Sequence, residues 1–317
     1  MTLRVAVLAG GPSPEASVSR SSAKQVAQAL TSAGHEVHLV ELDRDVFERL
    51  KRIEPEVVFP VLHGSPGEDG AVQGVLEVLG CAYVGSDVAG CAAAMNKFTA
   101  KQIFRSRNLT LARDMLIRRE DPLDVSMSQI LDHLGASVVL KPVSHGSALG
   151  VIPLPQGGDL QAALGEAFTY GETVLVEEFV VGREMTVGVL DLFGESSIAL
   201  PVTEIVVAAG EWYDYHNRYA AGQSEHIIPP HDLSKKAQAL LRRVAVEAHE
   251  ALGLADFSRA DFIVGDSEKY CLLEVNAIPG LTPTSLYPDA AQAVGISFEE
   301  LVGKLVSSAH DRGAKYG

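Results

Sequence analysis

The chain has 317 residues, 47% of them hydrophobic, and a formal net charge of −15, so it can bury a large core as two or three globular domains. This acidic balance argues against a nucleic-acid partner, which needs a basic surface, although a few local cations can still hold a small anion. The apolar stretches are too short to span a membrane and the N-terminus lacks a signal-peptide pattern, so we expect a cytoplasmic protein with no membrane partner.

The N-terminal third of the chain alternates between strand and helix patterns. Buried strands are expected at 4–10, 35–42 and 56–64, and an amphipathic helix at 19–34 separates the first two strands. This βαβ pattern predicts a parallel sheet, and ligands collect at the carboxyl ends of such strands. The loop at 10–17 lacks the G-x-G-x-x-G spacing of dinucleotide-binding loops.

A compact polar loop at 63–70 follows the third strand and contains three glycines together with Glu68 and Asp69. Its place at the carboxyl end of a strand predicts a binding loop. The alternative is a helix N-cap by Asp69 with Glu68 near the helix dipole, and both uses are compatible.

A second unit begins near residue 94 and a third near Gly182, so we divide the chain into 1–93, 94–181 and 182–317. The second unit has a helix, a strand, a Ser/Gly loop and a further strand. The third has a strand, a polar aromatic stretch, a long helix, a hairpin and a final helix. The regular elements are expected at 96–108, 137–143, 173–181, 184–191 and 232–253, which gives an α/β fold.

Four polar residues near the C-terminus form two pairs at mirror-image spacing around a turn at 265–269. They are Arg259, Asp261, Glu274 and Asn276. Residues two apart on a strand share a face, so a hairpin closing in this turn sets Asp261 opposite Glu274 and Arg259 opposite Asn276, unless a bulge shifts the register. Two carboxylates and a carboxamide on one face suit Mg²⁺, and facing carboxylates repel without a metal. The alternative is a solvated sheet face with an Arg–Asp pair.

Two lysines lie beside features that suit phosphate. Lys97 stands in the first turn of its helix, where the dipole disfavours a cation unless an anion is bound. Lys141 ends a strand just before the loop at 144–150, whose flexible backbone and free amides suit phosphate. Together with the carboxylate hairpin they predict a triphosphate clamp, although each lysine alone is compatible with a solvated position.

The stretch at 174–184 combines an apolar strand with acidic residues, followed by Gly182 and Glu184. A strand edge that offers backbone groups to adenine, with a carboxylate a few residues on for ribose hydroxyls, has this pattern. An ordinary interdomain strand with a solvated acid is the alternative.

The motifs, taken in order, resemble those of the D-alanine–D-alanine ligase family, ATP-grasp enzymes of peptidoglycan synthesis. The motifs at 63–70, 213–219 and 279–286, together with Glu15, are specific to this group, whereas 273–280 and the two lysines are shared by ATP-grasp enzymes generally. The resemblance spans nearly the whole chain. It implies an ATP-grasp fold with an N-terminal Rossmann-like parallel domain, ATP and two Mg²⁺ or Mn²⁺ ions as cofactors, and a homodimer.

The resemblance also implies a role for individual residues. Lys97, Lys141, Ser147 and Arg218 match the residues around the ATP phosphates, and Glu177, Phe179, Val180 and Glu184 match those that bind adenine and ribose. Asp261, Glu274 and Asn276 match the two-metal site. Glu15 matches the acid that holds the ammonium of the first D-alanine, and Ser147 and Tyr219 match the residues that hydrogen-bond to this acid. His63 matches a neighbour of the first substrate, and Arg259 matches the residue that stabilises the oxyanion. Gly280, Ser285 and Leu286 match the substrate-binding residues, the last two at the second carboxylate.

Three positions depart from the family pattern. The phosphate loop has His145 where the family often has Glu and Ala148 where it often has Ser, and the lid has Arg218 where Lys is usual. Tyr219 favours peptide formation, because a His replaces it in lactate-using members. The alternatives are a D-alanine–D-lactate ligase, a dipeptide ligase of antibiotic biosynthesis, and a non-catalytic nucleotide-binding regulator on the same scaffold.

Overall fold

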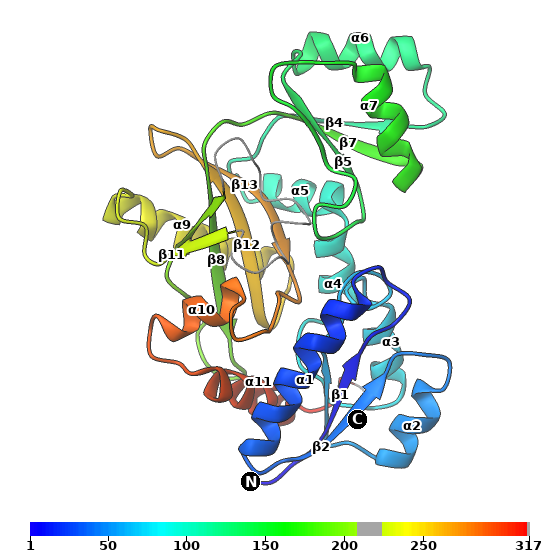
Figure 1. The fold of residues 1–317 in the computed structure, drawn as a ribbon, viewed down its shortest axis with the longest axis vertical. Helices are drawn as coiled ribbons and strands as arrows, with labels where there is room; N and C mark the ends of the chain where they lie inside the picture. The colour runs from blue at the N-terminus through cyan, green and yellow to red at the C-terminus, as the bar shows by residue number, and fades with distance from the viewer. Residues whose placement is uncertain (208–223, 316–317) are drawn as a thin grey trace.

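The computed structural model describes residues 1–207 and 224–315, which form an elongated molecule with three sheets (Figure 1). In the first sheet β1 (Arg4–Ala9) lies between β2 (Glu36–Glu41) and β3 (Val57–Pro60), and both pairings are parallel. The helix α1 (Ala16–Ser32) connects the first two strands. The predicted N-terminal βαβ arrangement is therefore confirmed.

Three short helices of the N-terminal unit lie outside the predicted elements. Each is eight residues long, about two turns, which is too short for apolar periodicity to stand out in a sequence window. They are α2 (Val46–Ile53), α3 (Ala71–Val78) and α4 (Val88–Met95).

The second sheet is antiparallel and has a self-contained core with its two helices. Its strands lie in the order β4 (Asp114–Arg118), β7 (Thr173–Glu178), β5 (Val138–Pro142), β6 (Ile152–Leu154). Apolar side chains from this sheet pack against α6 (Leu123–His133), α7 (Leu160–Ala167) and the 3₁₀ turn η1 (Phe168–Tyr170).

The third sheet is also antiparallel, and its last two strands, one of them at the edge, form the predicted hairpin. Its order is β11 (Ser224–Ile227), β10 (Thr203–Val207), β8 (Arg183–Asp191), β12 (Asp256–Val264), β13 (Tyr270–Asn276), with β9 (Ile198–Ala199) paired to β8. The helix α9 (Lys235–Ala251) packs on this sheet with an apolar face that includes Leu241, Val244 and Ala248.

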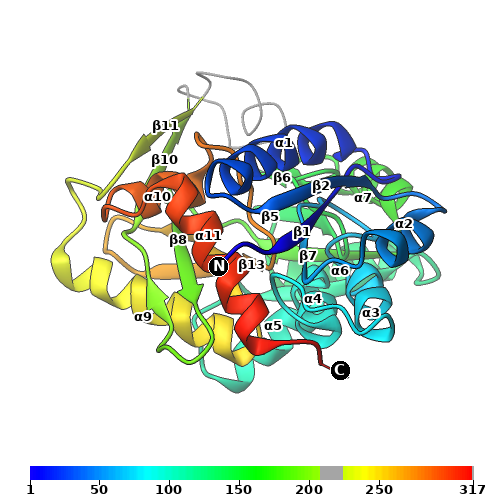
Figure 2. The ribbon, with the colours of Figure 1, turned by 90° about the horizontal axis from the view of Figure 1, so that it is seen from below.

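Two core clusters cross the predicted domain boundaries. The C-terminal helices α10 (Leu286–Gln292) and α11 (Phe298–Arg312) pack with α1 and the first sheet (Figure 2). The helix α5 (Lys97–Ser106) packs its buried side on the third sheet, although the division at residue 94 assigns it to the second unit. The boundaries themselves stay a prediction. No helix in the described residues is long and apolar enough to cross a membrane.

One buried carboxylate ties the first unit to the third. Asp256 is the first residue of β12 and is fully buried. Its carboxylate accepts hydrogen bonds of 2.7 to 2.8 Å from Arg312, from Ser308 and from the backbone N–H of Gly85. Arg312 also donates to the carbonyl of Tyr83 at 2.8 Å. Asp256 lies three residues before Arg259, so this contact fixes the start of the strand that carries the site.

We predict that Asp256→Ala lowers the free energy of unfolding by about 2–4 kcal/mol, because it leaves the half-buried Arg312 guanidinium, the buried Ser308 hydroxyl and the Gly85 N–H without their acceptor. Urea unfolding followed by fluorescence measures the change. The matched control is Asp266→Ala in the exposed turn before β13, with an expected change within about 0.5 kcal/mol. An Asp256 variant as stable as the control would contradict this role.

Candidate active site

The hairpin of β12 and β13 has the predicted register at its functional end. Asp261 lies opposite Glu274, and Arg259 lies opposite Asn276. A bulge lies between the turn and the site pairs: Phe262 pairs with Leu272 and Asp261 with Glu274, so Leu273 is the extra residue. This bulge sets the register at the site, which is the predicted one. All four side chains therefore project from one face of the sheet, which confirms the predicted arrangement.

The two facing carboxylates are each paired with a cation. Arg259 binds Asp261 through two hydrogen bonds of 2.8 Å, and Thr186 of the neighbouring strand β8 donates to the same carboxylate at 2.7 Å. Lys97 lies 3.0 Å from Glu274. The Arg–Asp pair of the alternative interpretation exists, yet Arg259 and Asp261 are each only 9% exposed, so this pair is buried.

The donor set of this face suits a hard cation that keeps water and phosphate ligands. Asp261 and Glu274 supply carboxylate oxygens and Asn276 an amide oxygen, and Mg²⁺ typically takes one or two carboxylates plus phosphate. The described residues contain no cluster of three His, Cys, Asp or Glu side chains able to hold a metal. A set of two carboxylates and one amide contains only two such side chains, so the absence of a three-residue cluster leaves these donors compatible with Mg²⁺.

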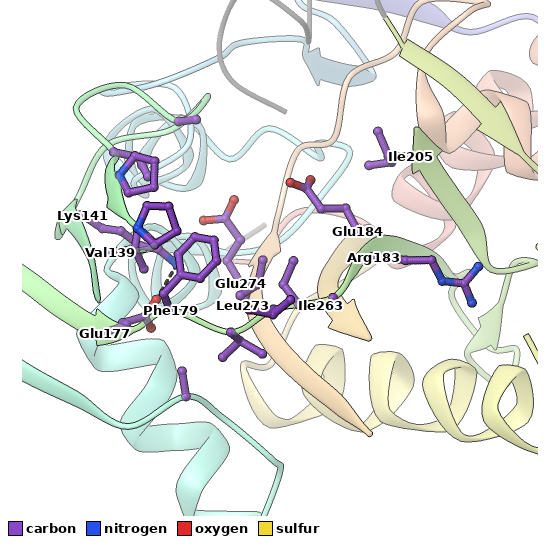
Figure 3. A pocket seen from close by; sticks show the side chains of 18 of the residues that line it. Val139, Lys141, Glu177, Phe179, Arg183, Glu184, Ile205, Ile263, Leu273 and Glu274 are labelled. Atoms are coloured by element: carbon purple, nitrogen blue, oxygen red, sulfur yellow. Dashed lines mark ion pairs between the residues drawn. The ribbon is translucent and has the colours of Figure 1, made fainter. Parts of the chain in front are cut away.

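A cavity of about 620 Å³ lies between the second and third sheets (Figure 3). In Figure 3, Lys141, Glu177 and Phe179 line one side, Glu184 and Ile205 lie across from them, and Glu274 lies between. Most of the predicted nucleotide residues line this cavity together, namely Lys97, Lys141, Glu177, Phe179, Val180 and Glu184.

The deepest charged group of this cavity is Glu177, which is 2% exposed and forms ion pairs with Lys141 and Lys101. Burial alone would raise the pKa of Glu177, but the charges of the two lysines outweigh it and the pKa lies below its ordinary value. Burial likewise opposes the charge of Lys141, yet Glu177 holds the pKa of that ammonium above its ordinary value. Glu177 and Lys141 are therefore both ionised near neutral pH.

A second cavity of about 800 Å³ lies between α1, the hairpin and α10. The predicted substrate residues that line it are Glu15, His63, Arg259, Gly280, Ser285 and Leu286. Ser147, predicted both as a catalytic residue and as one near the ATP phosphates, also lines this cavity and not the first one. Arg259 and Asn276 of the hairpin face this cavity, while Glu274 faces the first one. The loop at 144–150 also borders both cavities, since Ala148 lines the first cavity and Ser147 lines the second.

Glu15 is held where the first loop, the polar loop and the phosphate loop meet. It is 3% exposed and accepts a hydrogen bond from Ser147. Gly64 must be glycine here, because its φ is +70° and an added Cβ would lie 2.5 Å from Ser13 Oγ and 3.1 Å from Glu15 Oε2. The predicted binding loop thus leaves room for the Glu15 carboxylate.

The Glu68 side chain contacts residues of its own loop and holds the His63 ring in place. Its carboxylate accepts from the Gly64 N–H at 2.7 Å and lies 3.5 Å from His63 Nδ1. Burial lowers the pKa of His63, but the hydrogen bond and charge of Glu68, with the charge of Glu15, raise it above 6.5 overall. The other ring nitrogen, Nε2, is buried and has no hydrogen-bond partner among the described residues, and His63 is one of the residues that line the second cavity.

The departure at His145 has a local use. The His145 ring hydrogen-bonds the carbonyl of Tyr170 at 2.7 Å and contacts the Tyr170 ring edge-on, while the His145 carbonyl accepts from Lys97 at 2.8 Å. The loop is thereby anchored to η1 on one side and to α5 on the other. Nothing in the structure explains the alanine at 148.

Several site residues were missed by the sequence analysis. Lys101 lies one helical turn after Lys97, and that i, i+4 spacing is the signal that could have identified it. His226 of β11 contacts Asp289 of α10 at 2.6 Å beside the second cavity, and only the folded chain brings these two segments together. Arg218 and Tyr219 lie outside the described residues.

Comparisons with known proteins agree with this arrangement. Family models described as D-ala D-ala ligase N-terminus and C-terminus match residues 44–86 and 103–307. A D-alanine–D-alanine ligase of Desulforudis audaxviator is 42% identical over 98% of this chain and all of that protein, and one of Halalkalibacterium halodurans is 41% identical over 96% and 98%. The chain belongs to the D-alanine–D-alanine ligase family.

Solved structures of D-alanine–D-alanine ligase family members share the whole fold. A D-alanine–D-alanine ligase of Bacillus anthracis complexed with ATP matches with a TM-score of 0.85 and 27% identity over all of both chains. The VanG D-Ala:D-Ser ligase of Enterococcus faecalis matches with a TM-score of 0.82 and 27% identity over 98% of this chain and all of that one. The ATP-grasp fold predicted from the motifs is therefore confirmed.

We predict that Glu68→Gln lowers the pKa of His63, because burial then acts without the opposing carboxylate. In the wild type the folded pKa exceeds the ordinary 6.5, so the contact stabilises the fold below pH 6.5 and this contribution is lost as pH rises through the folded pKa. NMR titration of labelled imidazoles measures the shift, with His63→Gln to assign the signal. Glu36→Gln, beside surface His38, is the control; an unchanged His63 pKa in Glu68→Gln would contradict the coupling.

Proposed function

We propose that the protein joins two D-alanine molecules into D-alanyl-D-alanine, with ATP converted to ADP and phosphate, for peptidoglycan precursor synthesis. The observation that carries this proposal is that one hairpin borders both cavities. Glu274 faces the cavity with the two lysines, and Arg259 faces the cavity with Glu15. A nucleotide phosphate and an amino-acid carboxylate can therefore meet over the same strands.

The nucleotide has a suitable site in the first cavity. Phe179 and Val180 give apolar contacts for adenine, Glu177 and Glu184 offer acceptors for its amino group and for ribose hydroxyls, and the lysines face the phosphates. Asp261, Glu274 and Asn276 would hold Mg²⁺ or Mn²⁺, which would neutralise charge on the transferred phosphoryl group. Lys97 and Lys141 leave their present carboxylate partners to reach phosphate oxygens.

The first D-alanine fits the second cavity with its ammonium at Glu15. A buried carboxylate is a strong partner for an ammonium that must lose its water, and His63 lies beside it. The substrate's carboxylate then points toward the hairpin. One of its oxygens attacks the γ-phosphorus and ADP leaves, which gives an acylphosphate.

The second D-alanine completes the reaction. Its carboxylate binds at Ser285 and Leu286, close to Gly280, and its deprotonated amine attacks the acyl carbon. The oxyanion of the tetrahedral intermediate needs a fixed cationic donor, and Arg259 is held in place by its two hydrogen bonds to Asp261. Phosphate leaves with one oxygen of the first carboxylate. The roles of Ser147, Tyr219 and Arg218 in closing the lid belong to this proposal, as do the homodimer and the cytoplasmic location.

The competing functions differ in their products. A regulator without activity is disfavoured by the convergence of both lysines with the hairpin donors, and a D-lactate ligase by Tyr219. The decisive assay supplies ATP and Mg²⁺ with D-alanine, D-serine, D-lactate or L-alanine, and identifies products by mass. We expect D-alanyl-D-alanine as the main product; a depsipeptide or no phosphate release with D-alanine would overturn the assignment.

We predict that Glu274→Gln lowers kcat by roughly 100-fold or more in a folded protein, because a carboxamide cannot replace the charge that holds the metal and positions Lys97. Steady-state kinetics at saturating Mg²⁺ measure the loss. Glu268→Gln in the turn of the same hairpin is the control and should keep normal turnover. Near-normal activity of Glu274→Gln at saturating Mg²⁺ would rule out the metal site.

We predict that Glu15→Gln raises the KM of the first D-alanine by about tenfold or more and leaves the KM of ATP unchanged, since a charged hydrogen bond to the ammonium is lost. Initial rates with each substrate varied separately give both constants. Glu36→Gln on the surface of the same unit is the control. If ATP binding weakened instead and the D-alanine constants held, Glu15 would have another role.

A further inference from the structure

The helix α5 carries a stripe of cations beside the nucleotide cavity. Lys97, Lys101 and Arg105 are spaced four residues apart, so they lie on one face of the helix. Lys97 reaches Glu274 of the third sheet, whereas Lys101 and Arg105 reach carboxylates of the second sheet. Because α5 packs on the third sheet, this stripe joins the two walls of the nucleotide cavity.

Lys101 is the buried member of the stripe. It is 1% exposed, and its ammonium contacts Glu177, lies 2.9 Å from Asp114, and donates to the Ala112 carbonyl at 3.2 Å. An ammonium has three donors, and these three acceptors use all of them. Lys101 therefore has no donor left for a ligand and cannot be one of the phosphate-binding lysines.

A count of charges around Glu177 shows what Lys101 supplies. Two carboxylates, Glu177 and Asp114, face three cations, Lys101, Lys141 and Arg105, which leaves a surplus of one positive charge. Of the three, Lys141 borders the nucleotide cavity, and Arg105 is 37% exposed on the far side of Asp114. The surplus is thus available on Lys141.

We infer that Lys101 is a positioning residue for the nucleotide: it is the permanent counterion of Glu177, which frees Lys141 to move from Glu177 to a phosphate. This inference rests on the proposed ATP site. With Lys101 in place, Glu177 stays ionised and can accept a hydrogen bond from the adenine amino group while Lys141 is engaged elsewhere. Binding of the adenine and binding of the phosphates therefore both depend on Lys101, although Lys101 contacts neither group.

Loss of Lys101 changes this balance. Two carboxylates then face two cations, and any movement of Lys141 toward phosphate leaves Glu177 buried without a partner, which is strongly unfavourable. Lys141 is consequently retained by Glu177, and the nucleotide must bind without it. The effect requires the charge of Glu177, so it disappears when that charge is removed.

The test is a double-mutant cycle on nucleotide binding, with Lys101→Met, Glu177→Gln and the double variant, measured by calorimetry with Mg²⁺ and a non-hydrolysable ATP analogue. Lys101→Met should raise the Kd by about tenfold or more, the size expected for losing one charged contact. In the Glu177→Gln background the same change should alter the Kd by less than about twofold, because residue 177 then has no charge to compensate and Asp114 keeps Arg105 as its partner. In steady-state assays Lys101→Met should raise the KM of ATP but not that of D-alanine.

Controls separate this role from general stability. Lys304→Met removes a lysine paired with Glu300 on the surface of α11 and should leave the Kd unchanged. If Lys101→Met is unfolded at the assay temperature, Lys101→Gln, which retains hydrogen-bond donors, takes its place in the cycle. A wild-type Kd in the Lys101 variant, or an equal loss in both backgrounds, would overturn the inference.

The binding experiment also stands apart from the proposed reaction. A wild-type protein that binds the analogue with the expected cycle but does not ligate D-alanine would retain the role of Lys101 and remove the proposed function. If the protein ligates D-alanine normally but the Lys101 variants bind the nucleotide as the wild type does, the proposed function is retained and the role of Lys101 is removed.

Discussion

Charge pairing around the two cavities is the interaction on which the site depends. Three buried or half-buried carboxylates, Asp261, Glu177 and Glu274, face this region, and each is matched by a cation from the chain. Buried charges of one sign are costly, so the cleft is stable only while this matching holds. Ligands that carry phosphate and metal ions can replace the internal partners without leaving a charge uncompensated.

The fold places these partners on different structural units. Glu177 belongs to the second sheet, Glu274 to the third, and Lys97 and Lys101 to the helix between them. The first unit contributes Glu15, just before α1, and its position relative to the hairpin is fixed by the hydrogen bonds that join Asp256 to the Gly85 N–H and Arg312 to the Tyr83 carbonyl. Among the described residues, the core cluster of the second sheet includes no side chain from the other two sheets, whereas the first and third sheets share a cluster. The second sheet is therefore the unit best able to change position relative to the other two.

The sequence predicted the parts of the site that follow from local spacing. Strand periodicity and the turn at 265–269 predicted the pairing of Asp261 with Glu274, which the structure has, but they did not place the bulge between this pair and the turn. Family motifs then predicted the two groups of residues that line the cavities. The short helices of the first unit lacked a readable period, and the lid residues Arg218 and Tyr219 lie outside the described part of the chain.

Contacts between distant segments could not be predicted in this way. Lys101 looks like an ordinary helix-surface lysine until α5 is packed between two sheets, and His226 gains its partner Asp289 only when β11 lies beside α10. The family pattern likewise marks His145 as a departure but gives no reason for it, whereas the structure shows its ring holding the phosphate loop against η1.

Oxygen transfer from substrate to phosphate tests the central claim most directly. Ligation should be run with D-alanine labelled with ¹⁸O in both carboxylate oxygens, and the phosphate and dipeptide analysed by mass. Phosphoryl transfer to the first carboxylate predicts one ¹⁸O atom in each phosphate released per dipeptide. Phosphate without ¹⁸O, or label found in AMP, would contradict an acylphosphate formed over the hairpin of β12 and β13.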